Sequence, residues 1–153
     1  MSDLPSGLVT ERCLKWQPVL GIVGPCAEIS FARPEPYRVS VTMHFSAEQS
    51  GQPQDLLLEF REVTGLRWER EFPGFEHYPE NMPKCDKPWE GWSFPLLTVE
   101  GSAWLEQHRG VHEAASDLRL AHFVLLSSDD LLQVIATRDV SAHWVPAKER
   151  QLT

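Results

Sequence analysis

The chain has 153 residues, 42% of them hydrophobic and 24% charged, which is the balance of an ordinary folded domain. The formal net charge of −8 argues against a nucleic-acid partner, because phosphate contacts need a basic surface. It favours a basic protein partner, and the alternative is that this charge serves solubility alone. No apolar run approaches the roughly 20 residues that span a membrane, and the N-terminus has no secretion-signal pattern. We therefore expect a cytoplasmic protein without membrane contact.

The cysteines support the same compartment. Cys13, Cys26 and Cys85 are odd in number and widely spaced, which predicts neither a disulfide framework nor a metal site. We expect no cofactor.

The N-terminal half contains one clear hairpin. Residues 1–10 are expected to be loose, and residues 1–35 show no clear pattern, although Cys26 to Phe31 has the composition of a strand. Tyr37 to Phe45 alternates in hydropathy, which predicts a strand with one buried face formed by Tyr37, Val39, Val41, Met43 and Phe45. After the polar turn 47–53, Leu56 to Val63 continues the pattern as the second strand. This pairing would set His44 opposite Glu59 or Arg61. Leu66 to Phe72 predicts a third strand.

A long segment rich in proline and aromatic residues follows, over residues 72–95. Its five prolines exclude helix interiors and central strands, so we predict a loop. Aromatic residues interleaved with acidic ones are typical of protein-binding surfaces, and the candidate partner-binding residues are Phe75, Glu76, Tyr78, Glu80, Trp89, Glu90 and Trp92. The alternative is that these aromatic side chains fold back to form a satellite core.

The last third of the chain predicts more sheet and one helix. Phe94 to Val99 has strand composition, and Ser102 is a suitable N-cap for a short helix over Ala103 to Arg109 that ends at Gly110. From Leu118 to Val145, two apolar runs flank Ser127-Ser128-Asp129-Asp130, which predicts a hairpin, and Val140 to Val145 forms a third run. Residues 147–153 read as a loose tail.

These elements define the expected fold. We predict a single domain over residues 1–153 of the α+β class, rich in β-structure. It would consist of a twisted antiparallel sheet of six or seven strands, or a partial barrel, with one short helix.

Three segments resemble a known kind of protein. The patterns are W-x-F-P-L-L-x-V-E-G-S-x-W-L at Trp92 to Leu105, L-x-H-F-x-L at Leu120 to Leu125, and D-D-L-L-Q-V-I-A at Asp129 to Ala136. Together they resemble uncharacterised small bacterial cytosolic proteins of the immunity-protein type, over residues 92–145. The resemblance implies a non-enzymatic protein of unknown or inhibitor function. It transfers no catalytic role, because the matching residues are mostly apolar.

Few residues have a pattern that suggests chemistry. His108 and His112 have the spacing of zinc ligands on a helix, but Gly110 between them indicates a helix end. His122 lies within an apolar strand, where a core histidine is more common than a catalytic base. Asp129 and Asp130 fit turn chemistry. We predict no catalytic, cofactor-binding or metal-binding residues.

The sequence therefore favours binding over catalysis. We expect a non-enzymatic protein-binding module, specifically an immunity-type inhibitor of a basic toxin domain. The alternative is a small-molecule-binding domain or an enzyme that uses a sheet or barrel pocket, with His122, His44 and Glu59 as the groups to test. A third interpretation is a homodimer that forms through an exposed strand edge.

Overall fold

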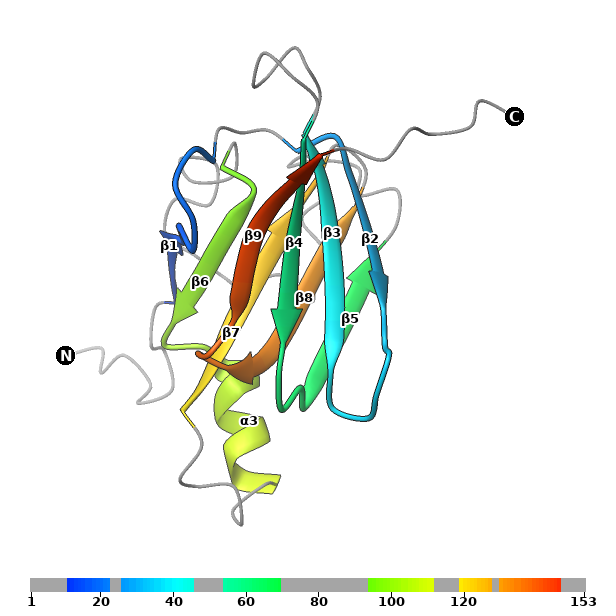
Figure 1. Ribbon diagram of the computed structural model, residues 1–153. Helices are drawn as coiled ribbons and strands as arrows, with labels where there is room; N and C mark the ends of the chain where they lie inside the picture. Colours follow the sequence, from blue (N-terminus) through cyan, green and yellow to red (C-terminus); the bar gives the residue numbers. More distant parts are fainter. Residues whose placement is uncertain are drawn as a thin grey trace, which may run out of the picture.

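The described part of the chain forms two antiparallel sheets and one short helix (Figure 1). The computed structural model describes residues 11–22, 26–45, 54–69, 94–111, 119–127 and 130–146. The expected fold class is confirmed, with the strands divided between two sheets that do not close into a barrel. The elements are β1 (Arg12–Lys15), β2 (Glu28–Ala32), β3 (Val39–Phe45), β4 (Gln54–Phe60), β5 (Gly65–Glu69), β6 (Leu96–Glu100), α3 (Ala103–Val111), β7 (Leu120–Leu126), β8 (Leu131–Thr137) and β9 (Ser141–Pro146).

The four-stranded sheet has the order β2-β3-β4-β9. It contains the predicted hairpin, in which β3 pairs with β4 so that Val41 faces Leu58. One prediction is wrong here: β3 begins at Val39, and Tyr37 lies in the preceding turn with 62% of its surface exposed. Pro36 explains the difference, because the ring fixes the local backbone and provides no hydrogen-bond donor. The strand composition of Cys26 to Phe31 corresponds to β2, whereas β1 has no counterpart among the predicted strands, so the six or seven expected strands are an underestimate.

The five-stranded sheet has the order β1-β6-β7-β8-β5 and contains the second predicted hairpin, β7 and β8. Two hydrogen bonds close the turn of this hairpin, as the serine and aspartate residues in the sequence predict. The Ser127 N–H donates to the Asp130 carbonyl oxygen at 2.9 Å, and the Asp130 N–H donates to the Ser127 hydroxyl oxygen at 2.9 Å. The predicted helix after Ser102 is α3, which packs against β7 and continues through Gly110 to Val111, so the prediction that it ends at Gly110 is wrong.

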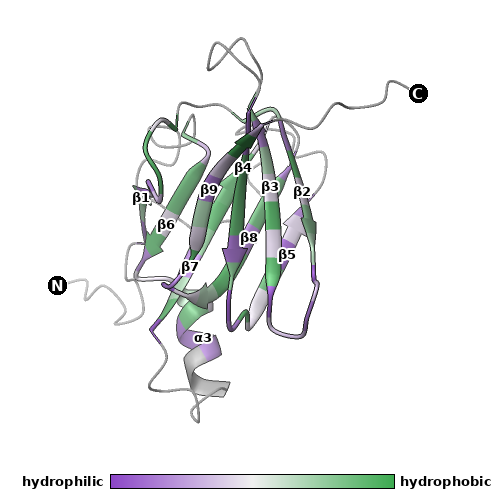
Figure 2. Ribbon diagram, in the orientation of Figure 1, coloured by the Kyte–Doolittle hydropathy of each residue, from purple (hydrophilic) through white to green (hydrophobic). Residues whose placement is uncertain are grey.

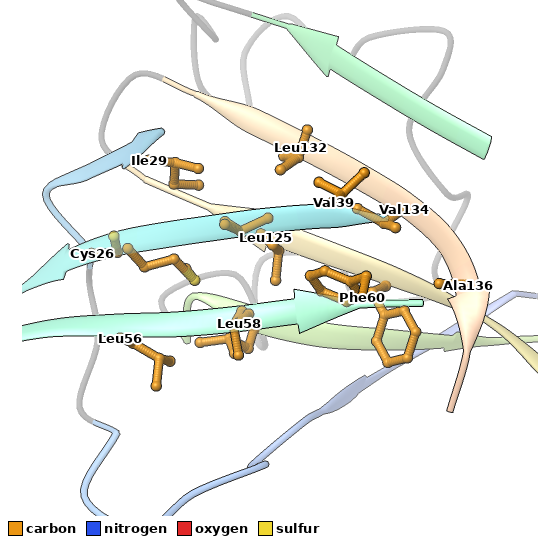
Figure 3. Close-up of a cluster of buried hydrophobic side chains, with 14 of the residues drawn as sticks. Cys26, Ile29, Val39, Leu56, Leu58, Phe60, Leu125, Leu132, Val134 and Ala136 are labelled. Carbon is orange, nitrogen blue, oxygen red and sulfur yellow. The ribbon is translucent and has the colours of Figure 1, made fainter. Parts of the chain in front are cut away.

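The main core lies between the two sheets (Figure 3). Leu58 and Phe60 of β4 meet Leu125 of β7 and Val134 of β8 in this layer. The Phe60 and Phe123 ring centroids are 5.2 Å apart, which is a favourable distance for an aromatic pair. Figure 2 shows hydrophobic residues along the strands of both sheets, and the side chains of this core are buried.

The β7 strand is buried on both faces. Ala121, Phe123 and Leu125 face the main core, whereas Val124 and Leu126 belong to a second apolar cluster. All seven residues of β7 are buried. A strand covered on both sides reads as a continuous apolar run, which is why this segment lacks the alternation seen in β3.

The cysteines differ from the sequence-based expectation. Cys13 of β1 is disulfide-bonded, and the prediction that the cysteines form no disulfide is therefore wrong for this residue. Cys26 is a free thiol, fully buried, and its Sγ contacts the carbonyl oxygens of Glu28 and His44 at 3.2 and 3.3 Å. Cys85 lies outside the described residues.

In the described part of the chain, α3 is too short to cross a bilayer, and no helix there has the length and apolar character of a membrane span.

Candidate binding surface

The partner-binding residues predicted from the sequence lie outside the described residues. This applies to Phe75, Glu76, Tyr78, Glu80, Trp89, Glu90 and Trp92. Their role as a contact surface stays a prediction. The expected loose termini and most of the 72–95 loop likewise lie outside the described ranges.

His44 and Glu59 both lie in the four-stranded sheet, but they are not cross-strand partners. His44 of β3 faces Asp55 of β4, whose carboxylate oxygen is 2.8 Å from the Nδ1 atom of His44. The expectation that His44 faces Glu59 or Arg61 is wrong, because Glu59 pairs with Ser40. Asp55 is buried beside His44, so this pair occupies a packed position on the sheet.

His122 belongs to a buried hydrogen-bonded chain. Its Nδ1 atom lies 2.7 Å from the Ser102 hydroxyl oxygen, and its Nε2 atom lies 2.8 Å from Oε1 of Gln133. With the Gln133 oxygen accepting from Nε2–H, Nδ1 is unprotonated and accepts the Ser102 hydroxyl hydrogen. The Ser102 oxygen also accepts the Leu105 N–H at 3.0 Å, which caps α3 as predicted.

The hydrogen-bonded network of Ser102, His122 and Gln133 has the features of a structural network. Burial lowers the pKa of His122 to about 4; the hydrogen bond to Gln133 opposes this change, whereas the nearby charges of Arg67 and His108 add to it. The imidazole is therefore neutral near pH 7 and a weak base. Ser102 and Gln133 are both buried, so the hydroxyl faces packed protein. The arrangement favours the core-histidine interpretation of His122.

Trp104 of α3 contacts both His122 of this hydrogen-bonded network and His108 of the same helix. Its ring centroid lies 5.0 Å from that of His122 and 5.3 Å from that of His108, and the Arg67 guanidinium lies 4.1 Å from the Trp104 ring centroid. The two ring nitrogens of His108 lie 3.1 and 2.9 Å from the carbonyl oxygens of Trp104 and Thr64.

No group of three His, Cys, Asp or Glu side chains among the described residues is placed to hold a metal ion. His112, the proposed companion of His108, lies outside these residues.

The turn between β2 and β3 displays an aromatic side chain in an unusual backbone conformation. The Arg38 N–H donates to the Glu35 carbonyl oxygen at 3.1 Å, and Tyr37 has a φ angle of +64°. With proline at its second position, this is the pattern of a type II turn, whose third position favours glycine. A non-glycine residue in the left-handed region costs about 1–2 kcal/mol. Tyr37 nevertheless occupies this position and exposes 62% of its surface.

Three connections gather at one end of the molecule (Figure 1), and we call this region the loop end: residues 33–38, 61–64 and 138–140. The Val63 N–H donates to the Tyr37 carbonyl oxygen at 2.8 Å. The Thr137 N–H donates to the Arg61 carbonyl oxygen at 3.1 Å, and the Arg61 side chain pairs with Asp139 at 3.6 Å. Backbone hydrogen bonds therefore fix the three connections relative to one another.

A small cavity opens beside Tyr37. Its volume is about 50 Å³, and it is lined by Pro34, Arg38, Val39, Ser40, Glu59, Phe60 and Arg61. Small-molecule sites commonly occupy roughly 300–1,000 Å³, so this cavity suits a single side-chain group rather than a whole ligand. Glu59, one of the groups suggested for a pocket, lines this cavity, whereas His44 and His122 do not.

Known protein families, curated proteins and solved structures were each compared with the chain, and none of them matches it.

Proposed function

We propose that this chain is a non-enzymatic protein-binding module whose loop end, centred on Tyr37, is the contact surface. The observation that supports this proposal is the left-handed backbone of an exposed tyrosine. Strained backbone is retained where it has a use, and tyrosine is among the residues most enriched at binding hot spots.

The surroundings of Tyr37 fit this role. Rigid sheets that present short loops at one end are a common way to build a binding surface. The hydrogen-bonded turn at Tyr37 and the hydrogen bond from the Val63 N–H to the Tyr37 carbonyl oxygen hold the loop end in shape before any partner binds. A surface that is already ordered loses less conformational entropy on binding.

The first test measures whether the left-handed backbone conformation of Tyr37 lowers the stability of the folded protein. Tyr37→Gly and Tyr37→Ala would be compared with the wild type by urea unfolding. Alanine keeps the left-handed strain and glycine removes it, so we expect Tyr37→Gly to be more stable than Tyr37→Ala by about 1 kcal/mol. We expect Tyr37→Gly to be at least as stable as the wild type. A loss of more than about 1 kcal/mol in both variants would mean that the ring stabilises the fold, which contradicts the proposal.

The second test measures binding. The wild type, Tyr37→Phe and Tyr37→Gly would each be immobilised on a solid support and incubated with lysate from the source cells. The proteins retained by each variant would then be quantified. The proposal expects a protein that wild type and Tyr37→Phe retain and that Tyr37→Gly loses. Equal retention by Tyr37→Gly, or no retained protein with any variant, contradicts it. Ser30→Ala is the control, because Ser30 is exposed on β2 outside the loop end, and it should retain the same protein as the wild type.

A further inference from the structure

We infer that the cavity beside Tyr37 receives a carboxylate from an acidic segment of the partner protein. This inference rests on the proposed function and names the chemistry of the group that is bound. It starts from the charge of the loop end, which differs from that of the whole chain.

Arginine is concentrated at the loop end. Residues 33–38, 61–64 and 138–140 hold four arginines against three acidic residues, although the chain as a whole carries a net charge of −8. The carbonyl oxygen of Arg119 also accepts the Arg138 N–H at 3.0 Å, which brings a fifth arginine to the same place. With Glu59 of the cavity included, arginines at the loop end still outnumber acidic residues by five to four, so this region suits an acidic contact better than the chain as a whole does.

Two of these arginines line the cavity, and a carboxylate of the partner can readily replace the acidic residues with which they now pair. The side chain of Arg38 pairs with Glu35 at 3.6 Å, that of Arg61 pairs with Asp139 at 3.6 Å, and both guanidinium groups are about half exposed. Exposed pairs at such distances contribute little to stability. A guanidinium binds a carboxylate through two parallel hydrogen bonds, and the Ser40 hydroxyl on the same wall adds a donor.

The remaining lining favours a protein carboxylate over a nucleic-acid phosphate. Glu59 lines the same cavity, and Glu35 and Asp139 pair with its two arginines. These carboxylates and the overall charge of −8 repel a polyphosphate backbone along its length. In the cavity itself a single carboxylate meets two arginines and a serine against one acidic residue, Glu59, and the volume of about 50 Å³ fits a group of that size.

The test is an NMR titration of the ¹⁵N-labelled full chain with three probes: a capped tetraglutamate peptide, a capped tetralysine peptide and a short oligothymidylate. We expect saturable shifts from tetraglutamate at the amides of residues 35–40 and 59–63. The double variant Arg38→Gln/Arg61→Gln is expected to weaken this binding at least fivefold. Arg12→Gln is the control and leaves it unchanged, because Arg12 forms a similar exposed pair, with Glu100 at 3.7 Å, on the edge strand β1.

The outcomes separate the two proposals. Absence of saturable tetraglutamate shifts at the loop end, or shifts that survive Arg38→Gln/Arg61→Gln, overturns the carboxylate inference. Tighter binding of the oligothymidylate or of tetralysine overturns it as well. The proposed function fails independently, when a retained protein does not depend on Tyr37.

Discussion

Gly65 and His108 are packed so closely that a Cβ atom at Gly65 would lie 2.9 Å from Nε2 of the His108 ring. The Trp104 ring is equally close to that position. This contact is where α3 meets the first residue of β5, and His108 also contacts the Thr64 carbonyl oxygen there. The absence of a side chain at Gly65 is therefore what allows the helix to approach the sheet.

Gly65→Ala should destabilise the protein by about 1–3 kcal/mol, because the added methyl group must displace two rings. The measurement is the midpoint and slope of urea unfolding. In a His108→Ala background the same substitution should cost less, since one of the two rings is gone. Equal stability of Gly65→Ala and the wild type would contradict the packing described here.

Acid should weaken the fold through His122. Its pKa in the folded protein is about 4, below the ordinary value of 6.5, so between these values the unfolded chain binds a proton that the folded chain does not. The free energy of unfolding should therefore fall as the pH is lowered through this window, by a total on the order of 3 kcal/mol from this group.

This contribution can be isolated by comparing variants. Urea unfolding of the wild type and of His122→Gln at about pH 7 and about pH 4.5 should show a smaller loss in the variant. His143→Gln is the matched control, a substitution of the same kind at an exposed position of β9. A pH dependence that is identical in His122→Gln and the wild type would contradict the assignment.

Ser102 should contribute to stability through two hydrogen bonds. Ser102→Ala removes the acceptor for the Leu105 N–H and the donor to His122, and should cost about 1–3 kcal/mol. Thermal unfolding followed by circular dichroism measures this change. Ser30→Ala, at an exposed position of β2, should leave the midpoint nearly unchanged. A midpoint for Ser102→Ala that matches that of Ser30→Ala would argue against the hydrogen-bonded chain.

Reduction should destabilise the protein because Cys13 is disulfide-bonded. A reductant is expected to lower the free energy of unfolding by roughly 2–4 kcal/mol. Cys13→Ser should show the same loss and no further response to reductant, whereas Cys26→Ala should keep the response, because Cys26 is a free thiol. Unfolding curves that coincide with and without reductant would be inconsistent with the bond.

Local pattern was enough to predict the hairpins. The alternation of β3 and the serine and aspartate residues between β7 and β8 both reflect interactions within a few residues, and the structure confirms both. The division into two sheets was not predictable in this way. It depends on which strands pair across long distances, as β9 does with β4, and a single sequence carries little information about such pairings.

The loop end was missed for a different reason. Tyr37 continues the apolar alternation of β3, so periodicity alone assigns it to the buried face. The preceding Pro36 was the available signal, since proline is common at the second position of a type II turn, whose third position favours glycine. The cavity and the Val63 hydrogen bond arise from residues distant in sequence, and no local pattern indicates them.

The pairing of β9 with β4 sets the order in which the molecule can be completed during synthesis. Leu57 and His143 are register partners, although more than half of the chain separates them. A nascent chain that has emerged only as far as β8 holds β4 with one unpaired edge, and sheet edges of this kind recruit other chains. Emergence of Ser141 to Pro146 from the ribosome is therefore the step at which β4 gains its second partner strand and becomes an interior strand of the sheet.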